Sequence, residues 1–275
     1  MTTRTEGKLN YLEKTLPDGL LVDAAWMERH GVKVLDAALP LRPAIERAAE
    51  RGAYSLSYMG HWLRCEIPLL EQEDEFVLYT DTDVVFLDAL FLGRVRPPLF
   101  ACAPEFRLTG ANYVNTGVMV MNVPALRDTA PAFLDYAAGE IAKVEGVYHD
   151  QYAYNRFYRG QWTPLDPRYN WKPYWPTRED IRIIHFHGAK LGAVRTLLDG
   201  EGNWDDVWWR VVGSLVASFQ PAYAEAIKAT LVAVKGHELE ERPWIEAIGR
   251  DLQTRTAPVP PEVVDLSFMN YDVGY

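Results

Sequence analysis

Short apolar runs alternate along the chain with longer stretches in which apolar residues recur at helical spacing. Each short run is rich in β-branched or aromatic residues and is bounded by Asp, Pro or Gly, a pattern that predicts β-strands. The predicted strands span residues 31–35, 76–80, 84–87, 99–103, 117–122 and 181–185. Helical stretches separate most of them, so strands and helices interleave along the chain.

The stretches with helical spacing predict helices at residues 42–51, 58–70, 131–144, 149–158, 204–219 and 221–235. Pro43 and Pro221 fit the first turn of a helix, where a missing backbone N–H is tolerated. Interleaved strands and helices predict an α/β fold with a mixed, largely parallel sheet flanked by helices. In such sheets ligands bind at the carboxyl ends of the strands. We expect one main domain over residues 1–200 and a helical carboxyl-terminal extension over residues 201–275.

The composition is that of an ordinary globular protein, because 48% of the 275 residues are apolar and 24% are charged. A formal net charge of −10, with no run of Lys and Arg, opposes binding to nucleic acid or anionic lipid. The first residues are polar, unlike a secretion signal, and no apolar stretch approaches the ~18 residues of a membrane span. We expect a cytoplasmic protein that binds no nucleic acid and makes at most peripheral contact with a membrane. Cys65 and Cys102 are expected to be free, buried thiols.

The sharpest local signal is a pair of carboxylates, Asp81 and Asp83, directly after the predicted strand 76–80. Side chains two residues apart share one face of an extended chain, and even in a turn both can reach one cation. Two neighbouring carboxylates are costly unless a cation or protons offset their charge. A divalent metal would do so, and oxygen ligands suit Mg²⁺ or Mn²⁺. The alternative is a surface turn with two solvated aspartates.

The same aspartates also resemble the first motif of haloacid-dehalogenase-type phosphatases, in which the first aspartate, here Asp81, attacks phosphorus. Those enzymes need a further acidic pair after a later strand, typically beginning with Gly-Asp, and this chain has no Gly-Asp dipeptide. The best substitute, Asp205-Asp206, opens a helix. The phosphatase therefore stays an alternative without a complete motif.

A further signal follows the predicted strand 181–185, which ends in His185 and is followed by Gly188 and Lys190. These residues offer an imidazole ligand, a backbone that can approach a phosphate closely, and an ammonium group that neutralises it. A lone histidine after a strand is more often structural, but here an aspartate pair is available to share a metal. Adding an imidazole to two carboxylates favours Mn²⁺ over Mg²⁺.

Two polar segments lie between these signals. Asn115 and Gly117 precede the predicted strand 117–122, and Asp150 and Gln151 open the predicted helix 149–158. Each has an ordinary explanation, because Asn is common in turns and Asp is common at helix starts. Their order along the chain, between the aspartate pair and the histidine, favours a functional role.

Taken in order, these segments resemble family 8 glycosyltransferases, the group that includes glycogenin and bacterial lipopolysaccharide galactosyl- and glucosyltransferases. The resemblance covers residues 58–190. Its pieces are Arg64 with Pro68, Asp81-Thr82-Asp83, Asn115-x-Gly117 with Asn122, Asp150-Gln151 with Asn155, the segment 165–171, and His185-x-x-Gly188. The resemblance implies a GT-A-type, Rossmann-like fold and a retaining, metal-dependent transferase of polysaccharide or lipopolysaccharide biosynthesis.

The resemblance also implies a role for each matched residue. Asp81, Asp83 and His185 would hold Mn²⁺, with Mg²⁺ as the alternative. Gly188 and Lys190 would cover the donor diphosphate. The other implied donor contacts are Arg64, Thr82, Asn115, Gly117, Asp150 and Gln151, with Asp150 and Gln151 placed at the reacting carbon. The implied reaction moves a hexose, glucose or galactose, from a UDP-sugar to a saccharide, glycolipid or other hydroxyl acceptor.

The chain departs from the family pattern in places. Lys190 comes one residue early, and Tyr152 replaces the second aspartate of the Asp-Gln-Asp triplet. The family's opening strand, which grips the nucleotide base, is expected either at residues 19–25 or upstream of this chain's first residue. If the strand is missing, the nucleotide pocket is impaired. A catalytically impaired nucleotide-sugar-binding domain is therefore the alternative to an active transferase.

Aromatic residues crowd the region before His185, and rings there can stack on an acceptor sugar or pack in the core. These candidate acceptor-binding residues are Trp162, Trp171, Tyr174 and Trp175. Three further tryptophans, Trp204, Trp208 and Trp209, lie at helical spacing and are expected to dock the carboxyl-terminal helices.

Overall fold

The computed structural model describes residues 2–4, 31–36, 39–109, 112–143, 149–237 and 239–270. The chain divides into two compact units. The first consists of Met1–Tyr79, Arg96–Ala101 and Val120–Thr163, and the second of Thr80–Val95, Cys102–Met119 and Pro164–Tyr275. The candidate opening strand at residues 19–25 lies outside the described residues.

The strands confirm most of the predicted pattern. They are β1 (Thr2–Arg4), β2 (Val34–Asp36), β3 (Phe76–Thr80), β4 (Val84–Phe86), β5 (Phe100–Pro104), β6 (Val114–Asn122), β7 (Thr163–Pro164) and β8 (Ile183–His185). A 4-stranded sheet has the order β3-β6-β5-β7, and β1-β2 and β4-β8 form pairs. The first pair is parallel and the second antiparallel, so the predicted mixed α/β fold is confirmed. The division between the units passes through β3, β5, β6 and β7.

The helices also follow the predicted order. They are α3 (Arg42–Glu50), α4 (Ile67–Leu70), α5 (Val123–Lys143), α6 (Asp150–Phe157), α7 (Leu191–Leu198), α8 (Val207–Ala233) and α9 (Arg242–Thr254), with 3₁₀ helices η1 (Leu56–Glu66), η2 (Pro167–Tyr169), η3 (Pro261–Val263) and η4 (Ser267–Asn270). Most of the predicted helix 58–70 is therefore the 3₁₀ helix η1. No helix among these residues combines the length and the apolar character needed to cross a bilayer.

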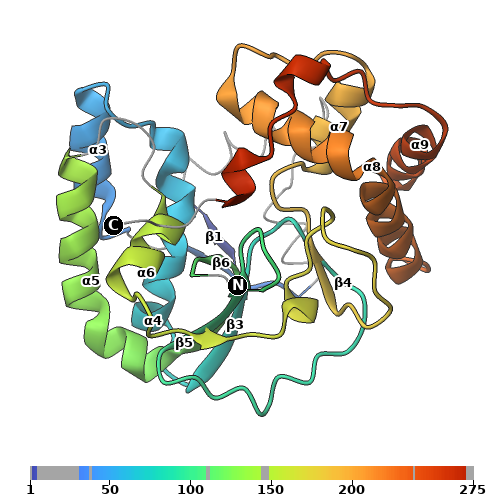
Figure 1. The fold of residues 1–275 in the computed structure, drawn as a ribbon. Coiled ribbons are helices and arrows are strands. Elements are labelled where there is room, and N and C mark those ends of the chain that lie inside the picture. The colour runs from blue at the N-terminus through green and yellow to red at the C-terminus, as the bar shows by residue number, and fades with distance from the viewer. Residues whose placement is uncertain are drawn as a thin grey trace. The chain divides into compact units, whose positions relative to one another are not determined.

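The helix α5 is central to the first unit, where it packs against α3, α4 and α6, as Figure 1 shows for α3 and α6. It begins at Val123 rather than at the predicted residue 131. Asn122 Oδ1 accepts a hydrogen bond from the Ala125 backbone N–H at 3.2 Å, and such a side-chain cap starts a helix. Pro131 is accommodated inside the helix.

An aromatic cluster joins α5 and α6 to β5 in the same unit. Phe133 of α5 lies 4.7 Å from Tyr154 of α6 between ring centroids, and Phe100 of β5 lies 5.6 Å from Tyr154. Tyr158 completes the cluster with its ring 5.4 Å from Phe133. These rings are buried, and they fix the middle and the carboxyl-terminal end of α6 relative to the strand β5.

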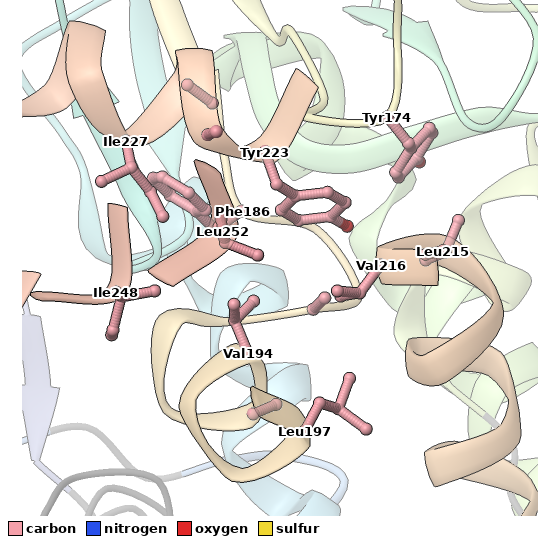
Figure 2. Close-up of a cluster of buried hydrophobic side chains, with 14 of the residues drawn as sticks. Tyr174, Phe186, Val194, Leu197, Leu215, Val216, Tyr223, Ile227, Ile248 and Leu252 are labelled. Carbon is pink, nitrogen blue, oxygen red and sulfur yellow. The ribbon is translucent and has the colours of Figure 1, made fainter. Parts of the chain in front are cut away.

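The second unit is built on a hydrophobic core in which β8 and the segment before it meet α7, α8 and α9. Figure 2 shows Phe186, Val194 and Leu197 facing Val216, Tyr223 and Ile248 in this core. Residues of this core come from the segment 171–198 as well as from the chain beyond residue 200. The second unit therefore contains residues on both sides of the predicted boundary at residue 200. An independent carboxyl-terminal extension stays a prediction.

The helix α8 spans both predicted helices, 204–219 and 221–235, in one element. The break that the sequence suggested is a kink at Phe219, where φ is −126° and ψ is 23°, because Pro221 cannot donate a backbone hydrogen bond. Trp204 and Trp209 pack against the core of this unit as predicted. Trp208 is exposed.

Candidate metal centre

The aspartate pair lies in the tight connection between β3 and β4, within the second unit. The Asp81 backbone N–H donates to the Gly117 carbonyl at 2.7 Å, which ties the connection to β6. β4 then pairs with β8, with Val84 opposite His185, and the Phe186 N–H donates to the Asp83 carbonyl at 2.9 Å. Backbone pairing therefore brings His185 to the aspartate pair, although about a hundred residues separate them in sequence.

The three side chains converge as predicted. His185 Nε2 lies 3.3 Å from Asp83 Oδ1 and 4.0 Å from Asp81 Oδ2. In the part of the chain that the structure describes, this is the one group of three or more His, Cys, Asp or Glu side chains whose ligand atoms all lie within 4.8 Å of one another. Two carboxylate oxygens and one imidazole nitrogen at this spacing fit a single divalent ion.

The electrostatics of the cluster suit a cation. Burial alone would raise the pKa of the Asp83 carboxyl, but His185 and Lys190 hold that pKa well below its usual range. Burial lowers the pKa of the His185 imidazole despite the neighbouring Asp83, and a neutral imidazole is the form that binds metal. The site therefore presents ionised Asp83 and an uncharged imidazole to a cation.

Lys190 is the residue just before α7, and its ammonium group forms an ion pair with Asp83. Gly188 precedes it with a φ of +79°, and a side chain at this position would lie 2.9 Å from Leu215 Cδ1. The left-handed backbone favours glycine here, and a side chain would also displace the Leu215 methyl group. Gly188 is thus explained by the fold, independently of its predicted approach to a phosphate.

Gly117 explains how closely β6 and His185 approach. A Cβ atom at Gly117 would lie 2.1 Å from His185 Cε1, a separation that no packing tolerates. Glycine is therefore required here so that the imidazole can lie directly against the strand. The predicted donor contact at Gly117 stays a prediction.

A buried polar chain supports His185 from behind. His185 Nδ1 lies 2.9 Å from Asn170 Oδ1, and Asn170 Nδ2 donates to Asn115 Oδ1 at 2.8 Å. Asn115 Nδ2 in turn donates to Glu105 Oε2 at 2.7 Å. Asn115 is 2% exposed. The structure thus places its side chain beneath the cluster, and the donor contact that the resemblance implied for Asn115 stays a prediction.

Glu105 is a residue that the sequence analysis missed. Its carboxylate is buried between Asn115 and His187, with His187 Nε2 2.9 Å from Glu105 Oε1. Burial would raise the pKa of Glu105, but His187 and Lys172 bring it to about 2. Burial lowers the pKa of Lys172 to about 7, although Glu105 opposes this. An acidic residue directly after the apolar strand 99–103 was the available signal.

Comparison with known proteins identifies this region. Residues 102–190 match the sequence model described as glycosyl transferase family 8. This segment of the chain is similar in sequence to glycosyltransferases of family 8. The matched region contains His185 and Lys190 at its end, whereas Asp81 and Asp83 precede it. A search of curated proteins found no match.

Solved structures of glycosyltransferases show a distant likeness to this one. LgtC in complex with donor and acceptor sugar analogues is 16% identical, with 67% of this chain and 83% of that chain covered and a TM-score of 0.46. GlyE of Streptococcus pneumoniae TIGR4 is 19% identical, covering 56% and 46%, with a TM-score of 0.40. Mouse xyloside xylosyltransferase 1 is 14% identical, covering 60% and 79%, with a TM-score of 0.41.

The first unit holds other residues of the predicted site. Arg64 Nε lies 2.6 Å from Asp150 Oδ2, and both side chains are buried. The Arg64 guanidinium also lies 4.6 Å from the centroid of the Tyr79 ring. Gln151 follows Asp150 in the first turn of α6. The structure thus brings Arg64 and Asp150 together, as the ordered motifs suggested, in a different unit from the metal cluster.

The predicted acceptor-binding rings divide into two groups. Trp171, Tyr174 and Trp175 are buried in the core of the second unit, so the packing alternative holds for these three and they offer no open face to a sugar. Trp162 is partly exposed and belongs to the first unit, and its acceptor role stays a prediction. Thr82 is exposed between the two aspartates.

Proposed function

We propose that this glycosyltransferase moves a hexose, glucose or galactose, from a UDP-sugar to a hydroxyl group of a saccharide or glycolipid. The observation that carries the proposal is the convergence of Asp81, Asp83 and His185 at one point. A nucleotide-sugar donor carries a diphosphate, and a divalent cation is the usual means of neutralising such a leaving group. A sugar donor with a metal-bound diphosphate therefore accounts for both the family and the cluster.

The donor set favours Mn²⁺, with Mg²⁺ as the alternative, because an imidazole joins two carboxylates. When bound, such an ion stabilises the negative charge that develops on the departing nucleotide. The neutral His185 imidazole and the ionised Asp83 carboxylate would hold it. The Lys190 ammonium, now paired with Asp83, is placed to pair with a phosphate oxygen once a cation takes its position beside the carboxylate.

The sugar-binding roles follow from the family resemblance. We propose that Arg64 and Asp150 bind donor hydroxyl groups as a pair, and that Gln151 lies at the anomeric carbon. The ion pair between Arg64 and Asp150 orients the carboxylate. The acceptor hydroxyl would attack on the face from which UDP leaves, and the departing phosphate oxygen would take its proton. That course retains the anomeric configuration without a carboxylate nucleophile.

A panel of nucleotide sugars with Mn²⁺, scored by release of nucleotide, tests the proposal. We expect turnover with a UDP-hexose, and Asp83→Ala should lower it roughly 100-fold or more because a ligand is lost. Asp74→Ala, which removes an exposed carboxylate from the segment before β3, is the matched control. Full activity of the Asp83 variant would contradict the metal assignment. Donor binding without turnover would instead support the impaired binding domain.

A further inference from the structure

The metal assignment raises the question of which nitrogen of His185 carries the proton. A metal ligand needs a lone pair on Nε2, the nitrogen that faces Asp81 and Asp83. The neutral imidazole has two tautomers, and only the form protonated at Nδ1 offers that lone pair. The inference below rests on the proposed metal role of His185 and concerns the residues that select its tautomer.

The orientation of Asn115 is fixed by a backbone group. The Gly117 N–H donates to Asn115 Oδ1 at 3.0 Å. A backbone N–H can only donate, so the oxygen of the Asn115 amide must face it. The Asn115 Nδ2 group then faces Glu105 Oε2 at 2.7 Å, where an ionised carboxylate can only accept. Both ends of the Asn115 amide are therefore assigned by groups that cannot reverse their roles.

The orientation of Asn115 is passed on to Asn170. Asn115 Oδ1 is an acceptor, so the Asn170 atom 2.8 Å from it must be the donor Nδ2. The other atom of that amide, Oδ1, then faces His185 Nδ1 at 2.9 Å. An amide oxygen can only accept, so Nδ1 must carry a hydrogen. In the neutral imidazole this leaves the lone pair on Nε2, directed at the aspartate pair.

The hydrogen-bonded series from Glu105 to His185 is closed to water, so no water molecule can replace the partners that fix the two amide orientations. Asn170 is 0% exposed, Asn115 2% and Glu105 5%. If either buried Asn amide were flipped by 180°, its NH₂ group would face another donor and its oxygen another acceptor. Each group left unsatisfied in this way costs about 1–3 kcal/mol. His185 Nε2 lies 3.3 Å from Asp83 Oδ1, and the space between these two atoms is the place that either a shared proton or a bound cation would take.

We propose that Glu105, Asn115 and Asn170 are positioning residues that hold His185 in its metal-binding tautomer. Glu105 and the Gly117 N–H set the direction of two amides in series, and the second amide holds the proton on Nδ1. Asn115 thus serves the metal centre from beneath instead of contacting the donor sugar. The three residues act through His185 and touch no reacting atom.

The direct test is the tautomer of His185 in the metal-free wild-type protein. Nitrogen NMR of protein labelled with ¹⁵N-histidine distinguishes the two tautomers, and His185→Gln identifies the signal among the 6 histidines. We expect the form protonated at Nδ1. The form protonated at Nε2 would overturn the proposal, and this arm requires no folded positioning variant.

Variants at Asn170 separate positioning from packing. Asn170→Ala removes the acceptor for Nδ1, so we expect mixed tautomers and an affinity for Mn²⁺ alone, measured by electron paramagnetic resonance, that is about 10–100-fold weaker. Asn170→Asp gives up the bond that Asn170 Nδ2 donates to Asn115 Oδ1 but keeps an oxygen facing Nδ1, so it should retain the tautomer and lose less affinity than Asn170→Ala. Equal loss in the two variants would indicate packing and overturn the proposal. Neither readout uses a nucleotide sugar, so failure of the proposed transfer reaction would be seen separately.

Discussion

At the scale of single residues, glycine at position 117 is the most sharply constrained choice. A Cβ atom there would lie 2.1 Å from His185 Cε1, so Gly117→Ala must displace the imidazole or the strand. We expect a loss of about 1–3 kcal/mol in the free energy of unfolding together with weaker binding of Mn²⁺. Thermal unfolding and a Mn²⁺ titration measure the two effects.

Gly139→Ala is the control for that variant. Gly139 lies in α5, and a Cβ atom there meets nothing within 4 Å. Alanine is the better helix former by about 1 kcal/mol, so this variant should be slightly more stable than the wild type. If Gly117→Ala behaved like Gly139→Ala, the close contact with His185 would not exist.

Replacing Lys190 should strengthen the binding of Mn²⁺ but weaken catalysis. Its ammonium group is paired with Asp83, where it competes with a cation for the carboxylate. Lys190→Gln should therefore bind Mn²⁺ more tightly in the absence of nucleotide, by about 1 kcal/mol or roughly fivefold. The same variant should lose nucleotide release, because the phosphate loses its counter-charge. Weaker binding of Mn²⁺ alone would show that Lys190 does not compete at the site.

The residues of the metal cluster were predictable, whereas their support was not. Asp81 and Asp83 follow one short apolar strand and His185 ends another, and ligands gather where such strands end. Asn170 lies in the segment 165–171, which resembles the family without an assigned role. Its amide acquires a function only through contacts with residues far away in the sequence. Glu105 was missed for the same reason, because its partners Asn115 and His187 are fixed by tertiary packing.

At the scale of elements, η1 and α6 meet through a pair of histidines in the first unit. His61 Nδ1 lies 3.3 Å from His149 Nδ1, and the ring of Tyr58 lies 5.3 Å from that of His149. Burial, together with the neighbouring His61, lowers the pKa of His149 to about 4. The residue that precedes α6 is therefore neutral at physiological pH.

This lowered pKa predicts how stability depends on pH. Between pH 6.5 and about 4, His149 is protonated in the unfolded chain but not in the folded chain. Unfolding therefore takes up a proton, and the free energy of unfolding decreases as the pH is lowered. The loss should reach roughly 2–3 kcal/mol near pH 4. His149→Gln should flatten the stability curve in this window, whereas a surface histidine variant, His237→Gln, should not. Parallel curves for His149→Gln and wild type would contradict the burial of a neutral imidazole.

The elements themselves were predicted better than their boundaries. β3 begins and ends where its apolar run does, since a strand between polar turns has little freedom. α5 begins at Val123 because Asn122 caps it, a signal hidden by the apolar strand that precedes it. α8 consists of two helical segments that meet at a kink at Phe219, close to the break that Pro221 predicted.

At the scale of the whole molecule, the division into two units assigns the metal cluster and its support to one of them. Asp81 and Asp83 come from Thr80–Val95, Glu105 and Asn115 from Cys102–Met119, and Asn170 and His185 from Pro164–Tyr275. No simple cut of the sequence yields this grouping. The predicted boundary at residue 200 rests on the helical pattern of the residues that follow it, whereas discontinuous units leave no mark on the sequence pattern, so that boundary stays a prediction.

A ligand site confined to one unit should stabilise the fold that forms it. The proposed Mn²⁺ ligands come from two segments of the second unit and their buried support from a third, so Mn²⁺ should raise the unfolding temperature as its concentration rises. The gain is about 2.7 kcal/mol at a metal concentration one hundred times the Kd. His185→Gln should lose this gain, and Asp74→Ala, which leaves the cluster intact, should retain it. A temperature shift that survived in the His185 variant would mean that Mn²⁺ stabilises the protein at another place, and the cluster would then no longer account for the metal.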